Sequence, residues 1–161
     1  MPYTMRVDGM EQISETLSSL KEGAEGIAAM ALYDGAGVMA DEIRHSADKI
    51  TTAPFVYASG GNVRLPSPEE KAIVVEAGAG IAKFSKNGSE VDTSVGYRNS
   101  GYAFLAGRRK PIPLIVNSIN SGTSFMRKQP FIRKAASSGA SKSIEAMKAK
   151  IEEAVAAITK E

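Results

Sequence analysis

The chain has 161 residues, of which 43% are apolar and 24% charged, and its formal net charge is +2. These values are typical of one soluble globular domain and exclude a disordered chain or a polycation. The sequence contains no cysteine and one histidine, His45. Disulfides, thiolate metal sites, cysteine nucleophiles and multi-histidine metal sites are therefore excluded.

Charge is distributed unevenly along the chain. Residues 1–50 carry nine acidic and four basic side chains, a net charge of −5. Residues 51–134 carry five acidic and twelve basic side chains, a net charge of +7, and the last 27 residues are balanced. An acidic N-terminal third and a basic middle can attract one another in neighbouring copies of the chain.

No segment of the sequence predicts a signal peptide or a membrane span. The first residues lack the basic segment and apolar stretch of a secretory signal. The longest unbroken apolar stretch, from Ile27 to Tyr33, is far shorter than the roughly 20 residues that cross a bilayer. We therefore expect a cytoplasmic protein without a membrane partner.

The first 50 residues predict two helices. Apolar residues recur at spacings of three and four at Met10, Ile13, Leu17 and Leu20. This spacing indicates a helix of about three turns. Gly23 and Gly26 weaken its continuation, so a second helix is expected from Ile27 to Ile50. Pro54 disfavours helical geometry at the residue before it and ends the second helix.

A loop and a short helix follow. Residues 55–66 are rich in Gly, Pro and Ser and predict a mobile loop. Ser67-Pro68-Glu69-Glu70 has the form of an N-cap followed by Pro at the first helical position, which predicts a helix to about Ala77. Residues 73–75 are also compatible with a strand.

The middle of the chain predicts a central antiparallel β-sheet. Alternating apolar residues at 81–84 and 91–97 flank Asn87-Gly88, and Asn-Gly between such stretches is typical of a hairpin. Residues 98–129 are expected to be a second mobile loop region. Within it, Tyr102 to Leu105 and Leu114 to Val116 are compatible with strands or a short helix.

The last segment predicts a long C-terminal helix that begins near Pro130, because apolar residues from Phe131 to Ile158 follow the 3.6-residue period. The fold class is therefore α+β, in a single domain over residues 1–161. It comprises two N-terminal helices, a central antiparallel sheet with a hairpin at Asn87-Gly88, and the long C-terminal helix.

Two glycine-rich segments match a dinucleotide-binding pattern. Residues 35–40 fit G-x-G-x-x-A, and residues 78–80 partly imitate it. The pattern binds a pyrophosphate only where a strand ends at a helix N-terminus. Because the residues before Gly35 have helical spacing, we favour close helix packing, and we expect no cofactor.

Few residues offer catalytic chemistry. His45 and Asp41 lie one helical turn apart, but no third residue completes a metal site or a triad. The hydroxyls of Thr123 and Ser124 have no base nearby in the sequence. We expect a polar helix face at His45, no catalytic residue and no metal, and a small hydrolase that uses His45 is kept as an alternative.

Basic clusters and loop aromatics form the candidate contact surface. A head-to-tail contact between copies, or with another protein, explains both the charge split and the apolar residues in loops. The predicted interface residues are Phe55, Tyr57, Arg108, Arg109, Lys110, Phe125, Arg127 and Lys128. The alternative is a nucleic-acid-binding module that uses the clusters at 108–110 and 127–128, since basic residues interleaved with aromatics bind single strands.

The order of several motifs adds a family resemblance. The motifs are Val7 to Met10 before a Leu-rich helix, Ala36 to Pro54 closing the next, Asn117 to Thr123 as a Gly-Thr segment, and Gln129 to Ala135 opening the last helix. Together they resemble the bacteriophage neck proteins that join head to tail or complete the tail, which include minor tail proteins. The resemblance covers nearly the whole chain.

This resemblance implies a structural virion-assembly protein of a phage or prophage, not an enzyme. The expected subunit forms a ring, hexameric to match tail symmetry, as a connector or tail completion protein. Its implied partners are copies of itself and the head-closure and tail-tube proteins, with nucleic acid only as the transiting genome. Its implied location is the neck or tail of the virion, and the host bacterial cytoplasm during assembly.

Overall fold

The computed structural model describes residues 10–54, 63–88, 90–98 and 100–160. Four helices and six short strands in these residues confirm the α+β class. The helices are α1 (Met10–Asp48), α2 (Pro68–Ala77), α3 (Ile112–Ser121) and α4 (Phe131–Thr159). The strands are β1 (Gly80–Ile81), β2 (Ser85–Asn87), β3 (Glu90–Asp92), β4 (Val95–Gly96), β5 (Tyr102–Leu105) and β6 (Arg108–Pro111).

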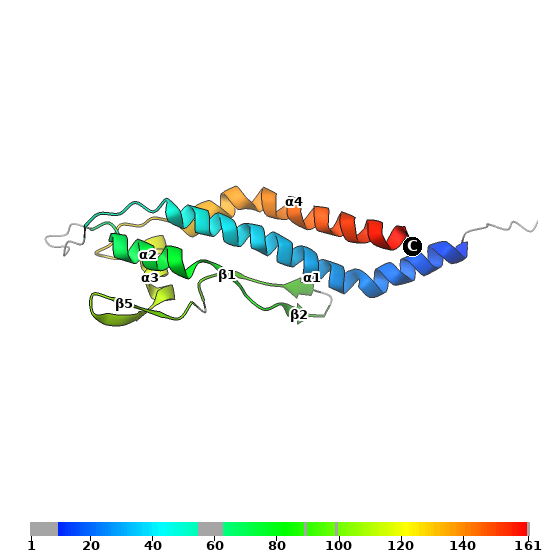
Figure 1. Ribbon diagram of the computed structural model, residues 1–161, viewed down its shortest axis with the longest axis horizontal. Helices are drawn as coiled ribbons and strands as arrows, with labels where there is room; N and C mark the ends of the chain where they lie inside the picture. Colours follow the sequence, from blue (N-terminus) through cyan, green and yellow to red (C-terminus); the bar gives the residue numbers. More distant parts are fainter. Residues whose placement is uncertain (1–9, 55–62, 89, 99, 161) are drawn as a thin grey trace, which may run out of the picture.

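The molecule is elongated, and its long axis is the pair formed by α1 and α4 (Figure 1). These two helices run antiparallel: Ser46 of α1 bonds to Phe131 at the start of α4, and Gly23 lies opposite Ile158 near its end. α2, α3 and the β5–β6 strands gather at one end of the pair. At the other end, α1 continues past the C-terminus of α4.

Small residues allow α1 and α4 to approach closely. A Cβ atom on Gly35 would lie 2.6 Å from Cγ of Met147, and one on Gly139 would lie 3.0 Å from Cγ of Glu42. The hydroxyl of Ser143 donates a 2.8 Å hydrogen bond to the carbonyl of Gly35. The interface at this point therefore has no room for larger side chains.

The prediction of two N-terminal helices is wrong, because α1 is continuous through Gly23 and Gly26. A glycine inside a helix costs roughly 1 kcal/mol relative to alanine, which favours but does not force a break. Helix-forming residues on both sides and the packing of Gly23 against Ile158 offset this cost.

The hydrophobic core lies where the second half of α1 meets α2, α3 and the start of α4. Ile43 and Ala47 of α1, Val74 of α2, Ile119 of α3 and Phe131 of α4 are all buried there. Tyr97 packs edge-on against Phe131 with ring centroids 6.3 Å apart, and burial raises the pKa of its hydroxyl to about 12. The core thus joins the broad end of the molecule, which is formed by α2, α3 and the β5–β6 hairpin, to the α1–α4 pair.

The predicted helix at 68–77 is confirmed, and the strand alternative for residues 73–75 is wrong. Ser67 and Glu70 form a capping box: Ser67 Oγ accepts from the Glu70 amide at 3.1 Å, and the Glu70 carboxylate accepts from the Ser67 amide at 2.8 Å. The two bonds satisfy amides that a helix N-terminus otherwise leaves without partners.

The predicted hairpin at Asn87-Gly88 is confirmed, but the strands do not form one central sheet. β1 pairs with β4 and β2 with β3, both antiparallel. Between the two ladders, residues 82–84 lie opposite only residues 93–94, and this extra residue interrupts the pairing as a β-bulge does. β5 pairs only with β6, so the described strands form three two-stranded ladders.

The predicted loop at 98–129 is wrong in part, because the segment contains β5, β6 and α3. The strand alternative for Tyr102 to Leu105 is confirmed by β5, and the short-helix alternative for Leu114 to Val116 is confirmed by α3. α3 forms because its buried residues Ile112, Ile115, Val116 and Ile119 recur at helical spacing against the core. In the other predicted loop, residues 55–62 lie outside the described residues. Of the remainder, Arg64 forms a parallel bridge with Met126, and Pro66 is buried.

The close contact at Gly35 predicts that Gly35 and Gly37 of α1 respond differently to substitution by alanine. Gly35→Ala is expected to lower the free energy of unfolding by about 1–3 kcal/mol, because the new methyl group overpacks against Met147. A methyl group on Gly37 would have no atom within 4 Å, so Gly37→Ala is expected to raise the stability by up to about 1 kcal/mol. Urea unfolding measures both, and equal effects of the two substitutions would contradict the packing assignment.

Candidate interaction site

A tight two-residue turn joins β5 and β6, and its sequence is not one that predicts such a turn. Leu105 pairs with Arg108, which leaves Ala106 and Gly107 as a two-residue turn. Both have positive φ, 51° and 74°. Asn-Gly is the usual sequence for such turns, since alanine pays a steric cost at positive φ. The alanine is why the sequence does not predict this hairpin.

The two faces of this hairpin differ in character. Leu105 is buried and Ala103 is half-buried against the core. On the opposite face, Tyr102 is 59% exposed and Phe104 is 73% exposed. Arg109 pairs across from Phe104 and therefore shares this face, and its guanidinium lies 4.3 Å from the centre of the Tyr102 ring. The exposed face thus presents two aromatic rings and a stacked cation.

The cations of the hairpin have no acidic partners among the described residues. Residues 93–144 contain nine basic residues and no acidic residue. The ion pairs in the described part of the chain involve Arg44, Arg64, Lys86, Lys142 and Lys150. Arg108, Arg109 and Lys110 take part in none of them, so their charge is available to a binding partner.

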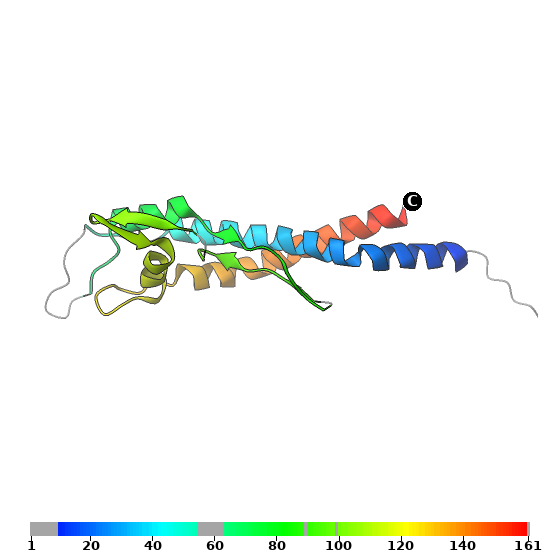
Figure 2. The same ribbon diagram turned by 90° about the horizontal axis from the view of Figure 1, so that it is seen from below.

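The second predicted cluster lies in the loop between α3 and α4. Thr123 orders its turn, because its Oγ1 accepts from the amide of Met126 at 3.0 Å. Phe125, Arg127 and Lys128 are exposed on this loop. Figure 2 shows the loop and the β5–β6 hairpin on different sides of α3, so the two basic clusters form two separate surfaces.

Arg64 fixes this loop to α2. Its amide donates to the carbonyl of Phe125 at 2.9 Å, and its carbonyl accepts from the amide of Arg127 at 2.8 Å. Its guanidinium donates two hydrogen bonds to the Glu70 carboxylate, at 2.6 and 2.7 Å. Burial alone would raise the pKa of Glu70, but the bonds from Arg64 and from the Ser67 amide outweigh burial and lower the pKa below its ordinary value.

Two predicted interface residues are not placed by the structure, and three exposed apolar residues are missing from the prediction. Phe55 and Tyr57 lie outside the described residues. The exposed aromatic pair Tyr102 and Phe104, and Leu114 on α3, are absent from the predicted interface although all three are exposed. The alternation of the two rings along a strand signals one exposed face only once the strand itself is assigned.

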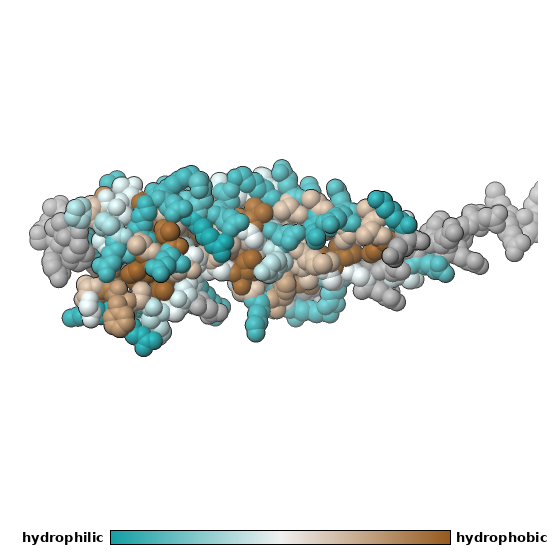
Figure 3. Space-filling model, viewed as in Figure 1, coloured by the Kyte–Doolittle hydropathy of each residue, from teal (hydrophilic) through white to brown (hydrophobic). Residues whose placement is uncertain are grey.

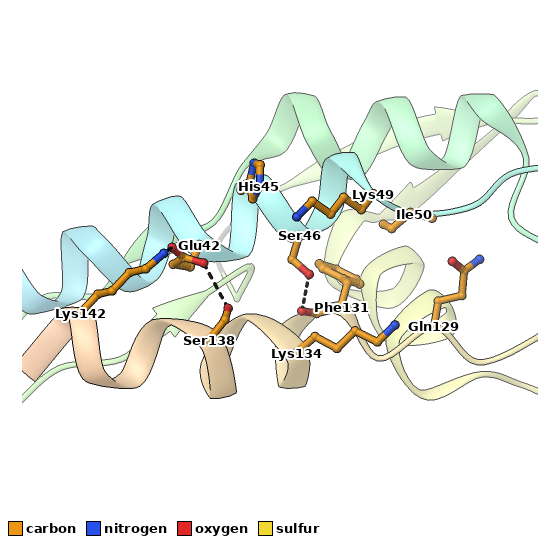
Figure 4. Close-up of a pocket in the computed structure, with 10 residues that line it drawn as sticks. All are labelled: Glu42, His45, Ser46, Lys49, Ile50, Gln129, Phe131, Lys134, Ser138 and Lys142. Carbon is orange, nitrogen blue, oxygen red and sulfur yellow. Dashed lines mark hydrogen bonds and ion pairs between the residues drawn. The ribbon is translucent and has the colours of Figure 1, made fainter.

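A groove between α1 and α4 contains His45, and Figure 4 shows its lining. Glu42 bonds to Lys142 and to Ser138, and Ser46 donates to the carbonyl of Phe131 at 2.8 Å. The hydrogen bond from Lys142, followed by that from Ser138, lowers the pKa of Glu42. These polar groups therefore join the two helices to one another.

The predicted polar helix face at His45 agrees with the geometry. Asp41 accepts a 2.7 Å hydrogen bond from Arg44 rather than orienting His45. Among the described residues, no three Asp, Glu or His side chains are close enough together to hold a metal ion.

No described helix is both long enough and apolar enough to span a bilayer.

The dinucleotide pattern at 35–40 lies inside α1, where the backbone amides are used within the helix. Gly35 packs against Ser143 and Met147, as the packing interpretation predicts. In the partial match, Gly78 ends α2 and Gly80 belongs to β1, so no helix begins there. Neither segment has the strand-to-helix turn that holds a pyrophosphate.

No family model, characterised protein or solved structure matches this chain.

The Arg64–Glu70 pair predicts a stability effect with a defined pH dependence. Glu70→Gln removes the charge from a buried pair and is expected to lower the free energy of unfolding by about 3 kcal/mol near neutral pH. Because folding lowers the pKa of Glu70, its stabilising contribution is present above the ordinary value of 4.5 and is lost as the pH falls through the folded-state pKa.

The stability difference between wild type and Glu70→Gln should therefore shrink as the pH falls below 4.5. Urea unfolding across this pH range measures it. Glu69→Gln is the matched control, because Glu69 is exposed and forms none of the ion pairs described above, and it should change the stability by less than about 0.5 kcal/mol. A constant difference across the pH range would argue against the assigned role of Glu70.

Proposed function

We propose that this chain is a structural virion-assembly subunit of a phage or prophage, a ring-forming connector or tail completion protein at the head–tail junction or the tail end. The observation that carries the proposal is the number of large apolar side chains exposed on separate elements. They are Met30, Tyr33, Val63, Val75, Phe84, Tyr102, Phe104, Leu114, Phe125, Ile144 and Ile151. Some of them are neighbours: the Tyr33 and Phe84 rings contact one another, and Tyr102 and Phe104 share one face of β5. Contiguous exposed apolar surface marks contact with other proteins.

α4 carries one part of this surface. Ile144 and Ile151 are 49% and 42% exposed and lie seven residues apart, hence on one side of the helix. The buried residues Ala135, Gly139 and Ser143 form a different stripe against α1. Figure 3 shows apolar patches on the outside of the helix pair as well as at the broad end. A second apolar stripe on a helix is suited to a neighbouring subunit.

The geometry also supports assembly through unlike surfaces. The exposed apolar residues of α4 and those of the broad end lie on different parts of an elongated molecule. Contacts between unlike surfaces generate a ring when the rotation closes. We propose a hexameric ring that contacts head-closure and tail-tube proteins, acts without catalysis, and occupies the virion neck or tail after assembly in the host bacterial cytoplasm.

The family resemblance supports the same function. Its Pro-Phe segment opens α4, where Phe131 is buried in the core and its carbonyl accepts a hydrogen bond from Ser46. Its Gly-Thr segment forms the turn after α3, where Thr123 Oγ1 accepts hydrogen bonds from two backbone amides. Both motifs thus act in joining the helices of the fold.

Light scattering tests the proposal through the isoleucines of α4. The double variant Ile144→Ser/Ile151→Ser is expected to weaken self-association, or co-assembly with neck and tail-tube proteins, by at least about tenfold, because burying two isoleucines contributes more than about 1.4 kcal/mol. Glu145→Ser/Glu152→Ser is the matched control at the neighbouring exposed positions and should assemble as wild type. A chain that stays monomeric and is recruited by none of these proteins would refute the function.

A second candidate function is nucleic-acid binding, and the exposed face of the hairpin favours it. Tyr102 and Phe104 share their face with Arg109, and Arg108 and Lys110 lie on the other face of the same hairpin; none of the three cations has an acidic partner in the described part of the chain. Aromatic rings beside cations stack and neutralise single strands. It predicts oligonucleotide affinity that falls steeply with added salt and that Phe104→Ala reduces. Fluorescence anisotropy with labelled oligothymidine measures this, and no binding at low salt would eliminate the candidate.

A further inference from the structure

We propose that the exposed face of the β5–β6 hairpin docks on the acidic side of α1 in a second copy of this chain. The inference rests on the proposed function, since it names two surfaces through which subunits of one assembly touch. A protein surface is favoured over a nucleic acid as the partner of the hairpin, because this same chain supplies a complementary acidic face.

The donor surface is the aromatic and basic face of the hairpin. Phe104 is the most exposed of the exposed large apolar residues described above, and Tyr102 lies two residues before it on the same face. Arg109 is held over the Tyr102 ring, so these two side chains of the face are already ordered together. Aromatic residues and arginines of this kind dominate the centres of protein interfaces, because they bury much area at a small entropic cost.

The acceptor surface is a row of aspartates on α1. Asp34, Asp41 and Asp48 follow one another at intervals of seven residues, which places them on one side of the helix about 10 Å apart. All three are exposed. Asp41 is paired with Arg44, whereas Asp34 and Asp48 take part in none of the ion pairs among the described residues. Every copy therefore carries an acidic acceptor whose outer two carboxylates form no ion pair in the described part of the chain, although the charge of Asp34 also acts on Lys150 of α4.

The two surfaces match in charge and in apolar character. Arg109 opposes the carboxylates from the aromatic face, and the exposed Arg108, which pairs with Leu105 beside the turn, adds positive charge next to it. The rings of the hairpin can pack on the exposed side chains of Met30 and Tyr33 near Asp34. Among the described residues of one chain, no ion pair joins these cations to α1. A row of docked copies has a free donor surface at one end and a free acceptor surface at the other, so docking continues until a ring closes or a filament grows.

A charge-swap experiment tests the docking. The donor variant is Arg108→Glu/Arg109→Glu, and the acceptor variant is Asp34→Lys/Asp48→Lys. Each variant alone is expected to self-associate at least about tenfold more weakly than wild type in sedimentation velocity at low salt. An equimolar mixture of the two variants should restore association, because every contact then joins opposite charges. One chain that carries all four substitutions should also self-associate.

Two further variants separate this contact from general electrostatics. Arg127→Glu/Lys128→Glu makes the same charge change in the other basic cluster and should leave association unchanged. Phe104→Ser removes the ring without changing charge and should weaken association. Because all substituted side chains are exposed, circular dichroism should show the folding of wild type in each variant.

Three results would overturn the docking. The first is a mixture of donor and acceptor variants that does not associate. The second is an equal loss in the Arg127→Glu/Lys128→Glu control. The third is a wild type that is monomeric at every concentration, even if its hairpin binds oligothymidine; a monomer that neck or tail-tube proteins still recruit would leave the proposed function standing.

Discussion

The close contact between α1 and α4 is the constraint on which the rest of the structure depends. Gly35, Gly139 and Ser143 let the helices meet at a distance that no larger side chain permits. The α1–α4 pair forms the long axis of the molecule. Its close contact therefore fixes the position of the second half of α1 relative to the start of α4. The hydrophobic core lies beside these two segments, and Ala47 of α1 and Ala135 of α4 are both buried in it.

The broad end is attached to this pair by polar contacts as well as by the core. Gln129 donates to the carbonyl of Thr51 at 2.7 Å and accepts from its amide at 2.9 Å, which ties the loop before α4 to the end of α1. Arg64 ties the same loop to α2 through Glu70. The loop that carries Phe125, Arg127 and Lys128 is therefore fixed both to α2 and to the segment after α1.

Elements with purely local signals could be predicted from the sequence. The helix at 68–77 follows from Ser67, Pro68 and Glu70, which act within one turn. The hairpin at Asn87-Gly88 follows from Gly88, whose φ is 64°, whereas Asn87 is the last residue of β2 and pairs with Glu90. The expected break at Gly23 and Gly26 is wrong because packing and neighbouring residues outweigh the local cost of glycine. The β5–β6 hairpin escapes prediction because Ala106 occupies a turn position that seldom holds alanine.

The sequence by itself determined which chemical groups the protein has and how its charge is distributed: −5 and +7 in successive segments, no cysteine and one histidine. It also determined the seven-residue spacing of Asp34, Asp41 and Asp48, since helical periodicity is local. Only the tertiary structure decided that these aspartates are exposed and that Tyr102, Phe104 and Arg109 share one open face. The physical reason is that exposure and cross-strand register depend on which segments pack together, and residues far apart in the sequence settle that.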